Sequence, residues 1–133
     1  MDRQEIPHFD NNPALRTIAM PADTNANGDM FGGWLLSQMD LAGSVLASYT
    51  SQTKVATIGI EAMKFHRPVF VGDEISCYTK IERIGNTSIT IFIETWVRRR
   101  QGRESEKVTE GTFTYVAIGE NRKPVAVLPE KRK

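Results

Sequence analysis

The sequence predicts an α+β domain in which an antiparallel sheet of about five strands wraps one long helix. Three features support this: a helical pattern over residues 30–50, period-two alternation after residue 54, and short, turn-rich links between the later segments. A single helix and a sheet can bury their apolar faces only by packing on each other. The 133 residues suit one domain of ordinary size.

The helix is predicted over residues 30–50, which contain no proline and few β-branched residues. Its apolar side chains recur at steps of three and four along one face: Leu35, Met39, Ala42, Leu46 and Tyr49. Asp29 stands just before the segment and is predicted as the N-cap, because its carboxylate can accept hydrogen bonds from the first turn. A short strand is predicted at residues 15–20, where Pro21 stops it.

Four further strands are predicted at residues 55–66, 74–84, 88–98 and 107–118. The last two links are short, which favours antiparallel hairpins. Both faces of 88–98 carry bulky apolar residues, so we expect one face to meet the helix and the other a second subunit. The domain is therefore expected to span 14–120, between a flexible N-terminal arm at 1–13 and a solvated C-terminal tail at 121–133.

Composition restricts the classes of partner. A net charge of +1 gives no indication of a nucleic-acid or membrane-surface partner. Cys77 is the only cysteine, which excludes an intrachain disulfide and suits a reducing cytoplasm. No apolar run approaches the roughly 20 residues of a membrane span, and the polar first residues do not resemble a signal peptide. With two histidines and one cysteine, neither a zinc site nor a Cys/His dyad is predicted.

Asp40 is the only charged residue between Met30 and Thr53, and it lies too far into the helix for capping to explain it. Its neighbours on the helix surface form a stripe of mostly small side chains: Gly33, Leu36, Ser37, Gly43, Ser44 and Ala47. One reading is a general base or nucleophile beside a substrate channel. The other is an exposed carboxylate, or one paired with a basic residue from the sheet or a partner chain.

Gly32 and Gly33 fall in the first helical turn, where each costs about 1 kcal/mol relative to alanine. They leave the free N–H groups of the helix start uncovered for a phosphate or a developing oxyanion. Alternatively, they only permit tight packing of the helix on the sheet. Asp29 and Asp40 lie about 16 Å apart along a helix axis, so they could meet at one substrate only across a two-fold interface.

The remaining polar candidates are weaker. His66 follows an apolar strand and is expected to be structural. The run Arg98-Arg99-Arg100, with Arg103, is expected either to be a solvated turn or to recognise a phosphate-rich ligand.

The segment 19–43, AMPADTNANGDMFGGWLLSQMDLAG, resembles the signature of bacterial acyl-CoA thioesterases of the YciA-like hotdog family. The similarity continues through residues 60–65, 68–73 and 84–88, and covers about residues 15–118. The resemblance implies a hotdog fold and hydrolysis of acyl-CoA to free acid and CoA. It also implies a homo-oligomer in which two units share one continuous sheet, and in which three such dimers assemble as a hexamer. No cofactor is indicated by the sequence.

The resemblance also implies site residues. The catalytic aspartate of the helix motif Ser-Gln-Met-Asp falls on Asp40, and a position that is asparagine in some relatives falls on Asp29. An aspartate cannot donate a hydrogen bond as an amide does, so Asp29 departs from a carbonyl-polarising role. The segments that contact CoA in similar proteins fall on Gly59, Ile60 and Glu61, and on Asn86, Thr87, Ser88 and Ile89.

A thioester is already activated, so hydrolysis needs a positioned water, a base and an oxyanion site. We expect Asp40 to activate the water and backbone N–H groups near Gly32 and Gly33 to hold the oxyanion. Direct attack by Asp40, giving an anhydride, is the alternative mechanism. Two other functions share this fold: a non-catalytic acyl-CoA-binding module, and dehydratases or isomerases that use a histidine, which this helix lacks.

Overall fold

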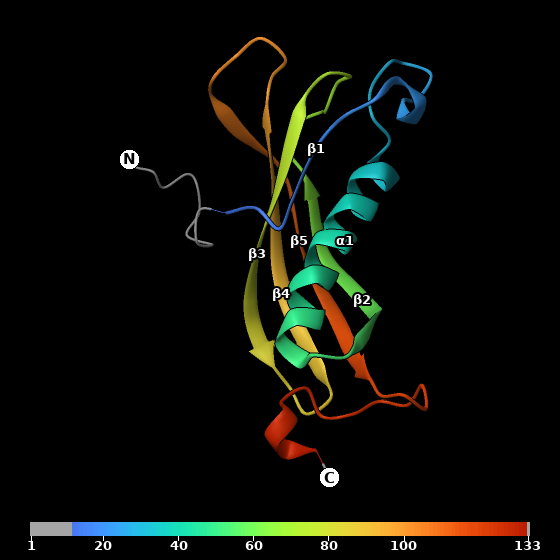
Figure 1. The fold of residues 1–133 in the computed structure, drawn as a ribbon. Helices are drawn as coiled ribbons and strands as arrows, with labels where there is room; N and C mark the ends of the chain where they lie inside the picture. Colours follow the sequence, from blue (N-terminus) through green and yellow to red (C-terminus); the bar gives the residue numbers. More distant parts are fainter. Residues whose placement is uncertain (1–11, 133) are drawn as a thin grey trace.

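A computed structural model describes residues 12–132, which form one long helix and a curled sheet (Figure 1). The elements are β1 Leu15–Ile18, a 3-10 turn at Pro21–Asp23, α1 Gly32–Ser51, β2 Lys54–Phe65, β3 Glu74–Ile84, β4 Ser88–Arg98, β5 Ser105–Ile118 and a 3-10 turn at Pro129–Lys131. The predicted N-terminal arm at residues 1–13 lies outside the described residues except for residues 12 and 13. None of the helices described is both long and apolar enough to cross a membrane.

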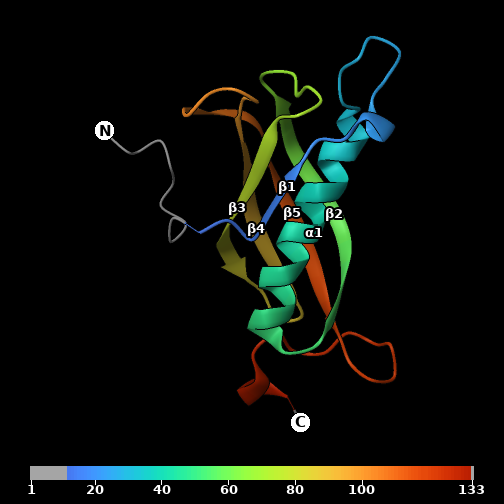
Figure 2. The same cartoon turned by 45° about the horizontal axis from the view of Figure 1, so that its top comes forward.

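The five strands pair in the order β1-β3-β4-β5-β2, and every neighbouring pair is antiparallel. The sheet curls so that α1 lies across its concave face (Figure 2). The predicted fold class, order of elements and hairpins are confirmed. Strands 74–84 and 88–98 match the prediction residue for residue, and the other strands differ by one or two residues at their ends.

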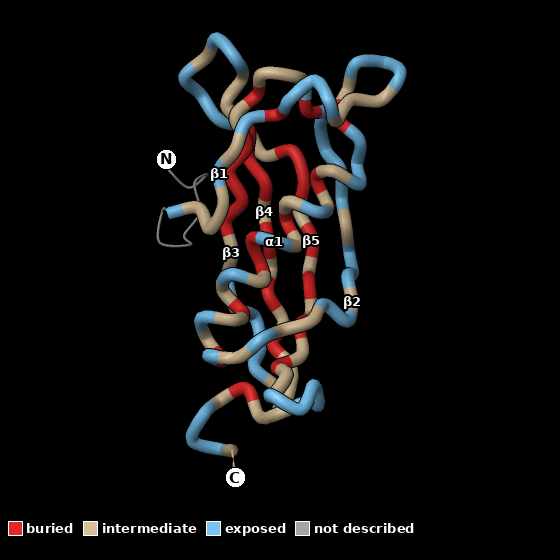
Figure 3. The backbone as a smooth tube through the Cα atoms, turned by 45° about the vertical axis from the view of Figure 1, so that its right-hand side comes forward, coloured by how far each residue is buried: buried red, intermediate tan, exposed pale blue. Residues whose placement is uncertain are grey.

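The core lies between α1 and the concave face of the sheet. Alternate residues of β4 and β5 are buried there: Ile89, Ile91, Ile93, Val97, Phe113, Tyr115 and Ala117. Figure 3 shows buried stretches along β3, β4 and β5, whereas β2 at the sheet edge is largely exposed. Leu35, Met39 and Ala42 of α1 are buried as predicted, but Tyr49 is 74% exposed. The prediction is wrong for Tyr49, which lies outside the buried arc of the helix: it is about 80° around the axis from Met39, beyond Ala42 and on the side away from Ala47.

The start of α1 differs from the prediction. Its N-cap is Phe31, and no side chain caps the first turn. Asp29 instead forms an isolated β-bridge with Phe70, and the N–H of Met30 donates to Val69 O at 2.9 Å. The chain at residues 29–30 is therefore extended along a distant loop. This long-range pairing, which local sequence does not show, overrides the capping preference of Asp29.

The segment after β5 is also different from the predicted solvated tail. Val125 packs against the core, and Val127 is fully buried. The N–H of Val127 donates to Asn86 O at 2.9 Å, and the Arg132 guanidinium donates to Ala126 O and to Ser51 O at the end of α1. Residues 121–132 thus cover one end of the helix and sheet.

The arginine run at the end of β4 takes part in the fold. Arg99 forms ion pairs with Asp73 at 2.6 Å and Glu106 at 2.7 Å, donates to Pro68 O, and places its guanidinium 5.3 Å from the centroid of the Phe70 ring. Asp73 is 2% exposed and also accepts the N–H of Phe70. Because Phe70 bridges to Asp29, this network holds the loop against which the start of α1 is built. Arg98 is likewise bound within the fold, to Glu74.

Replacing Arg99 with leucine is expected to lower the free energy of unfolding by about 2 kcal/mol, because it leaves the buried Asp73 carboxylate without its charged donor. The measurement is urea denaturation followed by circular dichroism. Arg103→Leu on the same hairpin is the matched control, since Arg103 has no ion pair with the residues described, and it should stay within about 0.5 kcal/mol of the wild type. Equal effects of the two substitutions would contradict the assignment.

Candidate active site

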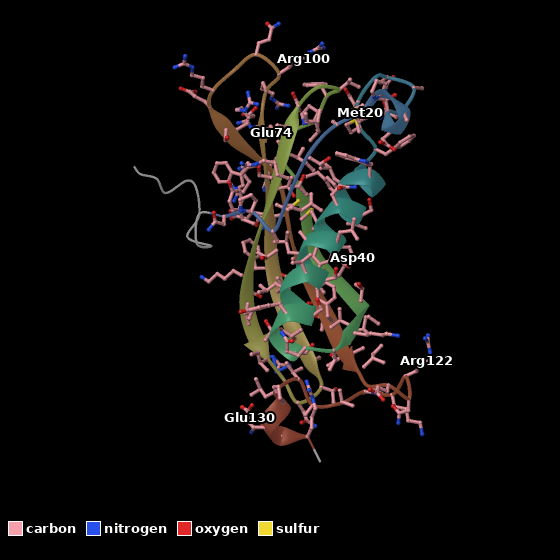
Figure 4. All side chains as sticks on the ribbon, in the orientation of Figure 1. Met20, Asp40, Glu74, Arg100, Arg122 and Glu130 are labelled. Carbon is pink, nitrogen blue, oxygen red and sulfur yellow. The ribbon has the colours of Figure 1, made fainter. Side chains whose placement is uncertain are left out.

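Asp40 lies in the middle of α1, half-buried (Figure 4). Its carboxylate accepts a hydrogen bond from Thr57 of β2, with 2.6 Å between Oγ1 and Oδ1. Its backbone carbonyl accepts a second bond, 2.9 Å long, from the phenol of Tyr115 on β5. Within residues 12–132 its side chain forms no ion pair, so the alternative of a basic partner from the sheet does not hold. Both of these hydrogen bonds come from neutral hydroxyls.

Thr57 and Tyr115 were not predicted from the sequence. They are directly opposite each other in the register of β2 and β5. The register shifts by one residue immediately after Thr57, so that Gly59 pairs with Thr114 and Ile58 is left over as a bulge. The inward position of Thr57 follows the strand alternation, but its cross-strand partner depends on where this bulge falls, and no local pattern gives that.

Two buried groups near the core have perturbed acidities. Burial, followed by the nearby Asp40 carboxylate, raises the pKa of Tyr115 far above its usual value, so the phenol is neutral and donates. Burial raises the pKa of the Cys77 thiol to about 11, so this cysteine is no nucleophile at neutral pH. Among the described residues, no three histidine, cysteine, aspartate or glutamate side chains gather closely enough to hold a metal ion.

The predicted stripe of small residues beside Asp40 divides in two. Gly43 and Ala47 are buried against the protein's own sheet, so the surface that approaches them is β4 and β5. A Cβ at Gly43 would lie 2.8 Å from Ile93 Cδ1 and closer still to the phenol oxygen of Tyr115. Only Gly33 and Ser37 of the stripe are exposed. The groove inferred from the sequence is therefore wrong at its C-terminal half, where the small residues serve helix–sheet packing.

Gly43→Ala is expected to destabilise the protein by about 1–3 kcal/mol, because the added methyl overlaps Tyr115 and Ile93. Helix propensity alone would favour alanine by about 1 kcal/mol, so the sign of the change reports the close approach. Thermal unfolding of Gly43→Ala and Gly33→Ala makes the comparison. A Cβ at Gly33 would have no described atom within 4 Å, and that variant should be as stable as the wild type or more so. A stabilised Gly43→Ala would contradict the packing described.

The glycines at the start of α1 are exposed. The first hydrogen bonds of the helix run from the N–H groups of Trp34 and Leu35 to Phe31 O, so the N–H groups of Gly32 and Gly33 precede them. A Cβ at Gly32 would meet only the edge of the Phe65 ring, at an ordinary 3.5 Å. Packing against the described residues does not require either glycine, which leaves their N–H groups as the feature to explain.

The two predicted CoA segments lie close together at one point. Glu61 of β2 and Ser88 of β4 line one open hollow on the outer face of the sheet, together with Glu82, Arg83, Thr90, Thr112 and Thr114. Gly59 pairs with Thr114 beside it.

The remaining predicted CoA residues do not line this hollow. Ile89 points the other way and is 1% exposed in the core, so its side chain cannot touch a ligand. The carbonyls of Asn86 and Thr87 already accept N–H groups from Val127 and Ala117, and Ile60 pairs with Phe113 on the inner face.

Comparison with known proteins identifies the family and agrees with the fold. Residues 27–104 match the family model described as the thioesterase superfamily, so the chain belongs to that superfamily. It is 49% identical over 123 residues to the acyl-CoA thioester hydrolase YciA of Salmonella typhimurium, covering 87% of this chain and 92% of that protein. The chain is thus a YciA-like member of the superfamily, as the sequence motif predicted.

Solved structures of similar proteins have the same fold. The hexameric broad-specificity acyl-coenzyme A thioesterase HI0827, as an aspartate-to-alanine mutant, aligns with a TM-score of 0.85 at 40% identity, covering 91% of this chain and 89% of that one. The hexameric hotdog fold thioesterase of Campylobacter jejuni aligns with a TM-score of 0.80 at 42% identity, covering 86% and 90%. The predicted hotdog fold is confirmed.

Proposed function

We propose that the protein hydrolyses acyl-CoA thioesters to a free carboxylic acid and CoA, with Asp40 as the general base. The observation that carries the proposal is the half-buried carboxylate of Asp40, oriented by Thr57 at 2.6 Å, in a chain that belongs to the thioesterase superfamily. A hydroxyl donor fixes the carboxylate and leaves its second oxygen available to accept a proton.

In the proposed reaction, Asp40 takes a proton from a water molecule while the water oxygen bonds to the thioester carbon. The carbonyl oxygen becomes an oxyanion, which accepts hydrogen bonds from backbone N–H groups at Gly32 and Gly33. The C–S bond then breaks, and the CoA sulfur leaves with the proton that Asp40 received. Water is the only co-reactant, so the reaction uses no cofactor.

One chain cannot supply both groups to one substrate. Gly33 and Asp40 are seven residues apart, which is about 10 Å along the axis of α1. An oxyanion donor must lie about 3 Å from the oxygen it stabilises. The helix start is therefore proposed to come from a second copy, whose antiparallel helix brings its first turn beside Asp40. Asp29 would arrive with it, and a role for that carboxylate stays a prediction.

The surface that a second copy would cover is apolar. We assign to it the large apolar side chains that are exposed just before α1, on α1 and on β2: Phe31, Leu41, Val45, Ile58, Ile60 and Phe65. β2 is also a twelve-residue edge strand, so its free backbone groups can pair with another β2 and continue the sheet. The hexameric relatives support further assembly of such dimers, and we propose a trimer of dimers.

CoA would lie along the same edge. The hollow lined by Glu61 and Ser88 is on the outer face of the sheet, one residue row from the Thr57–Tyr115 pair on the inner face. A long thioester can reach Asp40 with its acyl end and this hollow with its nucleotide end by passing around β2. The cytoplasmic location inferred from composition stays a prediction.

Asp40→Asn is expected to lower kcat roughly 10²–10⁴-fold, because the amide cannot accept the proton of the water. The assay measures free thiol released from acetyl-, butyryl- and palmitoyl-CoA. Asp23→Asn, at a carboxylate in the turn before the helix, is the control and should keep the wild-type kcat.

Full kcat in Asp40→Asn would remove Asp40 from the mechanism. An absence of thiol release by the wild type, with acyl-CoA still bound, would instead indicate the non-catalytic binding module.

Ile58→Lys is expected to reduce the oligomer to monomers and to abolish thioesterase activity, because Ile58 is 60% exposed on the face assigned to the second copy. Ile18→Lys is the matched control: Ile18 is 53% exposed on β1, at the opposite edge of the sheet. It should keep at least a dimer and the wild-type kcat. Light scattering and the thiol assay measure both quantities, and a monomeric Ile58→Lys with full activity would exclude a shared site.

A further inference from the structure

Asp40 is held at two points by one cross-strand pair of the sheet. Thr57 and Tyr115 face each other in the register of β2 and β5, and both direct a hydroxyl toward α1. Thr57 donates to the carboxylate at 2.6 Å, and Tyr115 donates to the carbonyl of the same residue at 2.9 Å. One hydroxyl thus orients the side chain, and the other holds the backbone that carries it.

The bond from Tyr115 is additional to the hydrogen bonding of the helix. Asp40 lies inside α1, where its carbonyl is the acceptor for the N–H of Ser44 four residues on. The phenol uses the second lone pair of that carbonyl. Gly43 makes this possible, since a Cβ there would occupy the space of the phenol oxygen. The sequence therefore places a glycine, with its helix-propensity cost, where Tyr115 must reach the helix.

We infer that Tyr115 is a positioning residue for the reaction: its hydroxyl fixes the helical turn of Asp40 at the depth where the carboxylate meets Thr57. This inference rests on the proposed function of Asp40 as the base. Tyr115 is fully buried in the core and does not touch the substrate in this assignment. Burial also raises the pKa of the phenol far above its usual value, so it remains a donor at neutral pH.

Loss of the hydroxyl should act on kcat through the position of Asp40. A shift of about 1 Å at a reacting group can lower a rate by up to about 10²-fold. Tyr115→Phe keeps the ring in the core and removes only the donor, so a kcat decrease on the order of 10-fold is expected, with KM changed less than about twofold. Tyr78→Phe is the matched control, because Tyr78 is a buried tyrosine on the outer face of the same sheet, and its kcat should equal that of the wild type.

If Tyr115 had only a structural role, its substitution would also lower activity, because a smaller fraction of the protein would be folded. The substitution is therefore compared in two proteins, the wild type and the Asp40→Asn variant. Tyr115→Phe is also introduced into Asp40→Asn, and kcat for butyryl-CoA is measured for the wild type, both single variants and the double variant. If Tyr115 acts through Asp40, the double variant has the same residual rate as Asp40→Asn. A further decrease by the same factor as in the wild-type background would overturn the inference.

A wild-type kcat in Tyr115→Phe would also overturn it. Full activity in Asp40→Asn would refute the proposed base itself, an outcome visible before the tyrosine is considered. If Tyr115→Phe expresses poorly, Thr57→Val and Gly43→Ser can replace it in the same scheme, because both disturb the two-point attachment of Asp40. Their kcat losses should then vanish in the Asp40→Asn background, and persistence of those losses would count against the inference.

Discussion

The close approach of α1 to the sheet at Gly43 is the contact on which the rest of the structure depends. Without a Cβ at that position, Tyr115 and Ile93 can lie directly beneath the helix. This depth buries Met39 and Ala42 on one side and brings the carboxylate of Asp40 within reach of β2 on the other. A helix standing farther from the sheet would lose both core packing and the Thr57 hydrogen bond, so stability and the candidate site share one geometric cause.

Asp40 and the free N–H groups at the start of α1 are positioned by different parts of the fold. Strands β2 and β5 hold the middle of α1, where Asp40 lies. The first turn of α1 is built on a loop that Arg99 fixes through Asp73. The helix is a rigid spacer between these two points, and its length keeps Asp40 and the free N–H groups of the same chain apart. A substrate that needs both therefore requires two copies of the chain.

The distribution of polar and apolar surface follows the same division. The exposed face of α1 and β2 carries large apolar side chains, as expected of a surface that another copy covers. The outer face behind β2 instead carries an open hollow with a polar lining of hydroxyls, two glutamates, Glu61 and Glu82, and one arginine, Arg83. The edge strand β2 thus separates an apolar side, where we propose the acyl chain and the second subunit, from a polar side, where we propose the nucleotide end of CoA.

The sequence by itself determined the elements and the catalytic candidate. Period-two and helical patterns are local properties, so they located β3 and β4 to the residue and marked Asp40 as the one charge on an apolar helix. Only the tertiary structure decided which groups meet Asp40, because the pairing of Thr57 with Tyr115 depends on a bulge and on contacts between residues far apart in the chain. The same reason explains the extended conformation at Asp29 and the burial of Val127. Local patterns encode which side of an element is buried, whereas its partners are set by long-range register.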